Sequence, residues 1–261
     1  MLSAEIRHRA AADLAEAEEG ATPIGPLVER LPGLDLDDAY AIQRCNIDRR
    51  CNAGDPVRGY KVGLTSRAMQ EMLGVGEPDF GHLLASMVLT SGAVVPAPAL
   101  IAPKVEVETA FVLGRALAGP GVSVVDVLRA TEFVLPAIEV IDSRIAEWRI
   151  SLNDTVADNA SSARVVLGTR PVPPADLDLR LTGAVLAHNG QVVETGTGAA
   201  VLGHPAVAVA WLANTLADYG IGFEEGQVIL PGSCTRAVDV HAGDLVRADM
   251  TDLGGVEVIF E

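Results

Sequence analysis

The chain has 261 residues, of which 49% are hydrophobic and 21% charged, a balance typical of a globular protein rather than a disordered one. Its net charge of −16, without any run of Lys and Arg, argues against nucleic acid or an anionic membrane as a partner. No segment reaches the apolar length of a membrane span, and the first twenty residues lack the apolar core of a signal peptide. The three cysteines have no CxxC spacing, so we expect a cytoplasmic protein without a zinc site.

Two helices are predicted before residue 57. The first covers Ser3–Ala17, which is rich in Ala, Glu and Arg, and the Pro and Gly residues of 23–26 end it. The second opens at Asp37 and runs to about Asn52, before a Gly-Asp-Pro sequence. The sequence therefore predicts a helical N-terminal segment over residues 1–56.

From Val57 onwards, short apolar segments alternate with Gly and Pro turns, a pattern typical of strands. Two helices interrupt this pattern, Ser123–Ala130 and Pro205–Tyr219. Many short strands with few helices favour a β-rich catalytic domain over 57–261, of α+β class and curled or barrel-like. The expected strands are Gly59–Leu64, Ala93–Val95, Val105–Leu113, Val134–Ile141, Val165–Leu167, Leu179–His188, Val228–Leu230, Leu245–Ala248 and Val256–Phe260.

Three acidic residues lie inside two of these apolar strands. Glu106 and Glu108 are two positions apart, so their side chains point to the same face of one strand, and Glu139 lies in another. Adjacent carboxylates repel one another, and a divalent cation between them removes that cost. The pattern indicates a Mg²⁺ or Mn²⁺ site, although acids on one face of a strand are equally typical of a sheet surface in water.

Other polar residues have two interpretations each. Lys61, in a predicted strand, is either a surface charge or a partly buried cation that acts as an acid or polarises a carbonyl. Asp79 and His82 lie in the predicted turn Glu77–His82, where an acid either caps the backbone or serves as a general base. The imidazole of His82 either titrates near neutrality or is an ordinary packing or surface residue.

Three loop segments carry small polar groups or glycine. Asp154–Ser162, with Asp158 and Ser161, is either an ordinary capped turn or a loop that binds a carboxylate. The turn Pro231–Arg236 offers the hydroxyls of Ser233 and Thr235 to an oxygen-rich substrate, or is simply a hairpin turn. The Gly-rich segment before the helix at Pro205 is suited to an anion, but it has no nucleotide-binding fingerprint.

Taken together, six blocks in register resemble the 2-keto-4-pentenoate hydratases, a group within the fumarylacetoacetate hydrolase superfamily. The resemblance extends in order over nearly the whole chain. The blocks are Lys61–Ser66, Leu73–Val75 with Pro78–Gly81, Pro103–Glu108, Leu135–Arg144, Asp154–Ser161 and Val201–Pro205.

This resemblance implies a mixed β-roll with helices outside, assembled as a homo-oligomer. The implied reaction adds water to a small 2-hydroxy-2,4-dienoate and gives a 4-hydroxy-2-oxo acid, as in meta-cleavage pathways. The metal ligands would be Glu106, Glu108 and Glu139, with Asp79 as the base for water and Lys61 as the acid or electrostatic partner. Contacts to the substrate carboxylate or around the metal ligands would come from Asp158, Ser161, Ser233 and Thr235.

Two alternatives remain open at this point. The related 4-oxalocrotonate decarboxylases share the metal acids and the Asp158–Ser161 block but lack the acid at Asp79, so Asp79 favours a hydratase. A non-catalytic role beside a pathway decarboxylase or aldolase is the other alternative. The segment Leu230–Asp239 looks most like the hydratases of steroid-ring degradation, which take a hexadienoate, whereas Gly255 replaces the usual serine of the family. The resemblance leaves the alkyl group of the diene open.

Overall fold

The computed structural model describes residues 1–65, 70 and 76–261. Three helices open the chain, and the two predicted ones are both present: α1 (Ala4–Glu19), α2 (Leu27–Arg30) and α3 (Leu36–Asn52). The side chains of Ser3 and Asp35 cap α1 and α3 by accepting hydrogen bonds from backbone N–H groups of the first turn.

Two sheets follow the helices. The first has eight strands in the order β2-β1-β10-β5-β6-β7-β3, with β11 also paired to β5, and the second has the order β4-β13-β12-β8-β9. The strands are β1 (Val57–Gly63), β2 (Asp79–Leu84), β3 (Val88–Thr90), β4 (Ala93–Val95), β5 (Lys104–Leu113), β6 (Thr131–Ile141), β7 (Ser162–Leu167), β8 (Gly183–His188), β9 (Gln191–Thr197), β10 (Val228–Leu230), β11 (Val238–Asp239), β12 (Leu245–Met250) and β13 (Gly254–Phe260).

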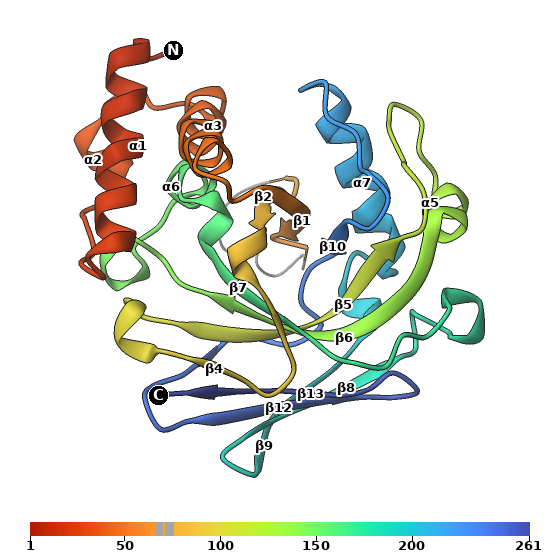
Figure 1. Ribbon diagram of the computed structural model, residues 1–261. Coiled ribbons are helices and arrows are strands. Elements are labelled where there is room, and N and C mark those ends of the chain that lie inside the picture. Colours follow the sequence, from red (N-terminus) through yellow and green to blue (C-terminus); the bar gives the residue numbers. More distant parts are fainter. Residues whose placement is uncertain (66–69, 71–75) are drawn as a thin grey trace.

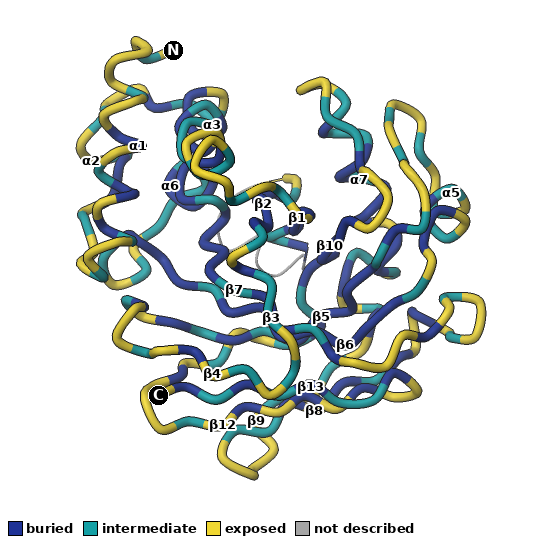
Figure 2. Tube along the Cα trace, viewed as in Figure 1, coloured by how far each residue is buried: buried dark blue, intermediate teal, exposed yellow. Residues whose placement is uncertain are grey.

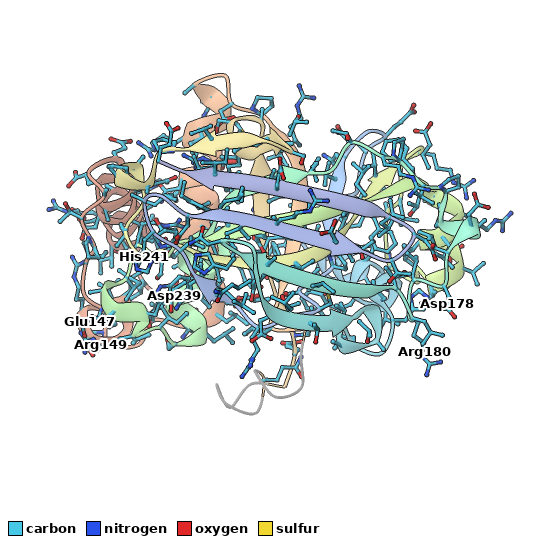
Figure 3. All side chains as sticks on the ribbon, turned by 90° about the horizontal axis from the view of Figure 1, so that it is seen from below. Glu147, Arg149, Asp178, Arg180, Asp239 and His241 are labelled. Carbon is cyan, nitrogen blue, oxygen red and sulfur yellow. The ribbon has the colours of Figure 1, made fainter. Side chains whose placement is uncertain are left out.

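The large sheet curls between two layers (Figure 1). The small sheet lies below β5 and β6, and the helices gather above them, with α1 and α3 on one side and α5 (Val124–Ala130) and α7 (Pro205–Ala217) on the other. Figure 2 shows the central strands buried along most of their length. Seen from below in Figure 3, the small sheet presents its outer face, and labelled charged residues such as Asp178 and His241 lie at its margins. The predicted α+β fold with a curled sheet is confirmed.

The apolar residues form two clusters. The larger one joins the N-terminal helices, through residues such as Leu14 and Ile42, to strand residues such as Val105 and Phe111. The smaller one lies on the glutamate-bearing face of the large sheet and includes Ala110, which shares its face of β5 with Glu106 and Glu108. The predicted division into residues 1–56 and 57–261 stays a prediction, and the two parts share the larger cluster.

The structure corrects some local predictions. The segment predicted as the turn Glu77–His82 instead enters β2, whose residues are all buried. The loop predicted over Asp154–Ser162 begins inside the helix α6 (Leu152–Ala157) and continues into a 3₁₀ turn at Asn159–Ser161. The strand β9 was not expected. The resemblance at Ser66 and Leu73–Val75 lies outside the described residues.

One segment passes a length and composition test for a membrane span, contrary to the expectation from sequence. This run, Gly198–Ala217, has 20 residues, and half of it is buried inside the fold. Its α-helical part is only α7, with 13 residues, and the buried residues of α7 belong to the larger apolar cluster. The run is therefore typical of a core helix.

Candidate active site

The three predicted glutamates meet on one face of neighbouring strands. In the antiparallel pairing of β5 with β6, Glu106 lies directly opposite Glu139, and Glu108 follows on the same face. A carboxylate oxygen from each lies within 4.8 Å of the others. Glu108 is 1% exposed and Glu139 is fully buried, so the alternative of a solvated sheet face is wrong.

The buried oxygens of this cluster lack protein partners. Among the described residues, Glu108 Oε1 and both carboxylate oxygens of Glu139 accept no hydrogen bond. Glu108 Oε2 accepts one from the backbone N–H of Gly232 at 2.8 Å. Among the described residues, the cation paired with this cluster is Lys61, whose Nζ lies 3.4 Å from Glu139 Oε2. Three carboxylates against one ammonium leave two negative charges, so the oxygen-only donor set and its charge fit a divalent cation.

Burial also changes the proton affinity of the cluster. It raises the pKa of Glu106 to about 7, and the negative charge of Glu139 adds to this effect. Burial, then the charges of Glu139 and Glu106, raise the pKa of Glu108 well above its usual range. Because a metal ligand must be deprotonated, cation binding at neutral pH should release protons from these groups.

We expect the metal-free protein to become less stable as pH rises. Burial raises the pKa of Glu106 from an ordinary 4.5 to about 7, so between these values the folded state holds a proton that the unfolded chain has lost. The free energy of unfolding should therefore fall from about pH 5 to pH 7. In chelator, melting temperatures at pH 5 and pH 8 should show a smaller fall for Glu106→Gln than for the unaltered chain, and equal falls would contradict this assignment.

Lys61 and Asp79 lie next to the glutamates. Lys61 is 4% exposed, so its interpretation as a surface charge is wrong, and its Nζ donates to the carbonyl of Ala160 at 3.0 Å. Burial lowers the pKa of Lys61, but the carboxylates of Glu139 and Asp79 outweigh this and raise it overall. The ammonium form is therefore retained at neutral pH.

Asp79 is 2% exposed, and its Oδ1 has no hydrogen-bond partner among the described residues. Burial raises its pKa, the Lys61 ammonium opposes that shift, and the Glu139 carboxylate adds to it. Asp79 lies opposite Gly63 in the β1–β2 pairing, and a Cβ at position 63 would overlap Asp79 Oδ1. A side chain at position 63 would therefore displace the Asp79 carboxylate.

His82 points away from Asp79, because the two lie three positions apart on β2. Its ring packs beside Tyr60 and Phe80, with ring centroids 5.1 and 6.1 Å away. Burial lowers its pKa to about 4. Of the two interpretations of this imidazole, packing is the one that the structure supports.

Asp158 and Ser161 do not join the glutamate cluster directly. Asp158 is buried in an ion pair with the guanidinium of Arg144, and it accepts a further hydrogen bond from the Arg144 N–H at 2.9 Å. Burial raises the pKa of Asp158 to about 6, against the opposing effect of Arg144. The Ser161 hydroxyl lies 3.3 Å from that of Thr155. Their predicted roles around the substrate stay predictions.

Ser233 and Thr235 bind the strand that carries the glutamates. The Ser233 hydroxyl lies 3.2 Å from the Val107 carbonyl, and the Thr235 hydroxyl accepts from the Val107 N–H at 3.3 Å. Val107 stands between the two glutamates of β5, so these contacts hold the 231–236 loop beside the cluster. Whether either hydroxyl contacts substrate stays a prediction.

Sequence reasoning missed three contributors to the site: the Gly232 N–H, the Ala160 carbonyl and the Arg144 guanidinium. Two of them are backbone groups, whose identity no side-chain pattern reveals. Gly232 has a φ of 109°, and a Cβ there would also overlap Thr65. The Pro-Gly pair at 231–232 was the one available signal for this turn.

Comparison with known proteins finds relatives over nearly the whole chain. A 2-keto-4-pentenoate hydratase of Paraburkholderia xenovorans (strain LB400) is 44% identical over 260 residues, covering 100% of this chain and 97% of the relative. A 2-hydroxyhexa-2,4-dienoate hydratase of Comamonas testosteroni is 47% identical over 239 residues, covering 91% and 90%.

A solved structure is also similar over the full chain. It is a 4-oxalocrotonate decarboxylase from Pseudomonas putida G7 in complex with magnesium and adipate, with a TM-score of 0.97, 39% identity, and coverage of 100% and 99%. The family described as fumarylacetoacetate (FAA) hydrolase C-terminal matches residues 49–259. The chain therefore belongs to the fumarylacetoacetate hydrolase family.

Proposed function

We propose that this protein is a metal-dependent hydro-lyase that adds water to a 2-hydroxy-2,4-dienoate and releases a 4-hydroxy-2-oxo acid. The observation that carries the proposal is the buried Asp79 carboxylate, with its unpartnered Oδ1, next to the three-glutamate cluster and Lys61. Relatives that are 44 and 47% identical and named as hydratases of such dienoates support the same reaction.

Glu106, Glu108 and Glu139 would hold Mg²⁺ or Mn²⁺. When bound, the cation would supply Lewis acidity that stabilises negative charge on the substrate. A divalent cation is also present in the magnesium complex of the similar decarboxylase.

The residues of the chain would divide the proton transfers. The dienol first loses the proton of its C2 hydroxyl and takes one at C5, which gives an α,β-unsaturated ketone that is electrophilic at C4. Asp79 would accept a proton from the water that attacks C4, and the enolate that results would take a proton at C3 to give the product. The raised pKa of Asp79 makes it a stronger base than an exposed aspartate. Lys61, held as an ammonium, would stabilise the negative charge that develops on the substrate oxygens.

Decarboxylation is the second candidate, because the 4-oxalocrotonate decarboxylase matches the whole fold at a TM-score of 0.97. Both reactions need an electron sink at the 2-oxo group. A cation held by the three glutamates would provide it equally well in either reaction. Only hydration also needs a group that takes a proton from water. Asp79 therefore supports the hydratase.

We expect the purified protein with Mg²⁺ to convert 2-hydroxypenta-2,4-dienoate into a product heavier by one water. The dienol absorbance should disappear, and mass spectrometry should identify the 4-hydroxy-2-oxo acid. In a parallel reaction, 2-oxohex-3-enedioate should release no carbon dioxide. Carbon dioxide release at a rate comparable to hydration would instead support the decarboxylase.

The finer assignments are also proposals. A hexadienoate substrate from steroid-ring degradation is supported by the likeness of Leu230–Asp239 to those hydratases, and by the 47% identity to the Comamonas testosteroni relative. The ratio of kcat/KM for the hexadienoate and pentadienoate tests it. We also propose a cytoplasmic homo-oligomer, with or without an associated pathway aldolase or decarboxylase, which light scattering and co-purification would test.

A further inference from the structure

A strained turn lies against Lys61. After α6, the residues Asn159, Ala160 and Ser161 all have left-handed backbones, with φ values of 53°, 50° and 55°. Such conformations are unfavourable for residues other than glycine, although asparagine tolerates them better than most. Three in succession persist only where the surrounding contacts hold them in place.

The side-chain amide of Asn159 supplies such contacts. Its Oδ1 accepts a hydrogen bond from the His82 N–H at 2.8 Å, and its Nδ2 donates to the His82 carbonyl at 2.9 Å. The Asn159 amide thus pairs with both the N–H and the carbonyl of His82, as the backbone of a neighbouring strand would. His82 lies on β2, the terminal strand of the large sheet (Figure 1), so this pairing occupies the edge of β2 that β1 leaves open.

The same turn reaches the reactive groups from its other side. The Ala160 carbonyl accepts the hydrogen bond from Lys61 Nζ at 3.0 Å. Gly81, the partner of Lys61 in the β1–β2 pairing, packs so closely that a Cβ there would lie 2.5 Å from the Asn159 carbonyl oxygen. Asp79 lies two residues before Gly81 on the same strand. The turn is therefore connected to Lys61 directly and to Asp79 through β2.

We propose that Asn159 is a positioning residue for the hydration reaction. By pairing with His82 it holds the left-handed turn against β2, and the turn places the Ala160 carbonyl where it orients the Lys61 ammonium. This inference rests on the proposed hydratase function. It assigns a role to a side chain that contacts neither the glutamate cluster nor Lys61.

The chain contains a matched control for this role. Asn214 on α7 makes the same pair of contacts to another residue, accepting from the Val122 N–H at 2.8 Å and donating to the Val122 carbonyl at 2.9 Å. Val122 lies in the segment before α5, and neither residue belongs to the glutamate cluster. Loss of this second pairing should affect stability without affecting turnover.

The test compares Asn159→Gly with Asn214→Ala. Glycine adopts the left-handed backbone without strain but lacks the amide, so this variant removes the pairing without adding backbone strain. We expect kcat to fall by about 100-fold, the scale of a misplacement of about 1 Å at a reactive group. We expect KM and the dissociation constant for Mn²⁺ to stay within about threefold, because the glutamates are unchanged. Asn214→Ala should keep kcat within about twofold.

A second measurement does not depend on activity. Hydrogen–deuterium exchange of the metal-free proteins should show faster exchange in the β2 peptide, residues 79–84, for Asn159→Gly and no change there for Asn214→Ala. If Asn159→Gly does not fold, Asn159→Asp is the replacement, since it keeps the acceptor for the His82 N–H and loses the donor to the His82 carbonyl. It should show the same changes to a smaller degree.

The outcomes separate the two proposals. If the parent protein is active and Asn159→Gly has the same kcat, the positioning role is overturned. This holds whatever hydrogen–deuterium exchange shows for β2. An equal loss of kcat in Asn214→Ala would also overturn it, because the effect would then be general destabilisation. If the unaltered protein hydrates no dienoate, the proposed function fails instead. In that case, unchanged hydrogen–deuterium exchange of β2 in Asn159→Gly would show that the pairing of Asn159 with His82 does not hold β2.

Discussion

Replacement of Glu139 by glutamine is expected to abolish turnover and tight divalent binding while the fold is retained. Glu139 is fully buried, and both of its carboxylate oxygens are free of hydrogen bonds among the described residues. Glutamine preserves the shape but removes one charge and one oxygen donor. Removing even a hydrogen-bond partner of a metal ligand typically costs 10–100-fold, so loss of the ligand should cost more than about 100-fold in kcat/KM.

The matched control is Glu132→Gln, because Glu132 lies on the same strand and is exposed. Isothermal titration with Mn²⁺ should give an unchanged dissociation constant for this control and no measurable binding for Glu139→Gln. Melting temperature in chelator checks the fold. If Glu139→Gln keeps full activity in the presence of chelator, the three glutamates do not form a metal site.

The sequence was sufficient for the parts of the site that depend on local periodicity. Alternation along a strand puts Glu106 and Glu108 on one face, and this holds wherever the strand is placed. Glu106 lies opposite Glu139 because of the register of β5 with β6. No local sequence pattern encodes that register. Glu139 was therefore recognisable as an acid in an apolar strand, but its place opposite Glu106 follows only from the fold.

Burial and backbone contacts were harder to predict. Lys61 had a surface interpretation and Asp79 a backbone-capping one, because the charged partners of each lie on other strands. The sequence predicts a turn over Glu77–His82, although from Asp79 onwards this segment forms a buried strand. Gly81 is required there by its close approach to the Asn159 carbonyl. The ion pair of Asp158 with Arg144 likewise joins residues 14 positions apart, which no local pattern encodes.

Replacement of Asp79 by asparagine is expected to separate water activation from metal binding. The amide has nearly the same shape but cannot accept the proton of the attacking water. General base catalysis typically contributes 10²–10⁴-fold, so kcat should fall by about that factor. The three glutamates remain intact, and the dissociation constant for Mn²⁺ should stay within about threefold, the margin expected from removing one nearby charge.

Glu77→Gln is the control for this variant, because Glu77 lies two residues away and is exposed. The measurement is the rate of 4-hydroxy-2-oxo acid formation at saturating dienoate, with Mn²⁺ titration of each variant in parallel. Glu77→Gln should match the parent protein in both. Unchanged kcat in Asp79→Asn would show that Asp79 is not the base. Loss of Mn²⁺ binding in that variant would show instead that Asp79 takes part in holding the cation. Only a large loss of kcat with Mn²⁺ binding preserved supports the division in which the glutamates bind the cation and Asp79 deprotonates the water.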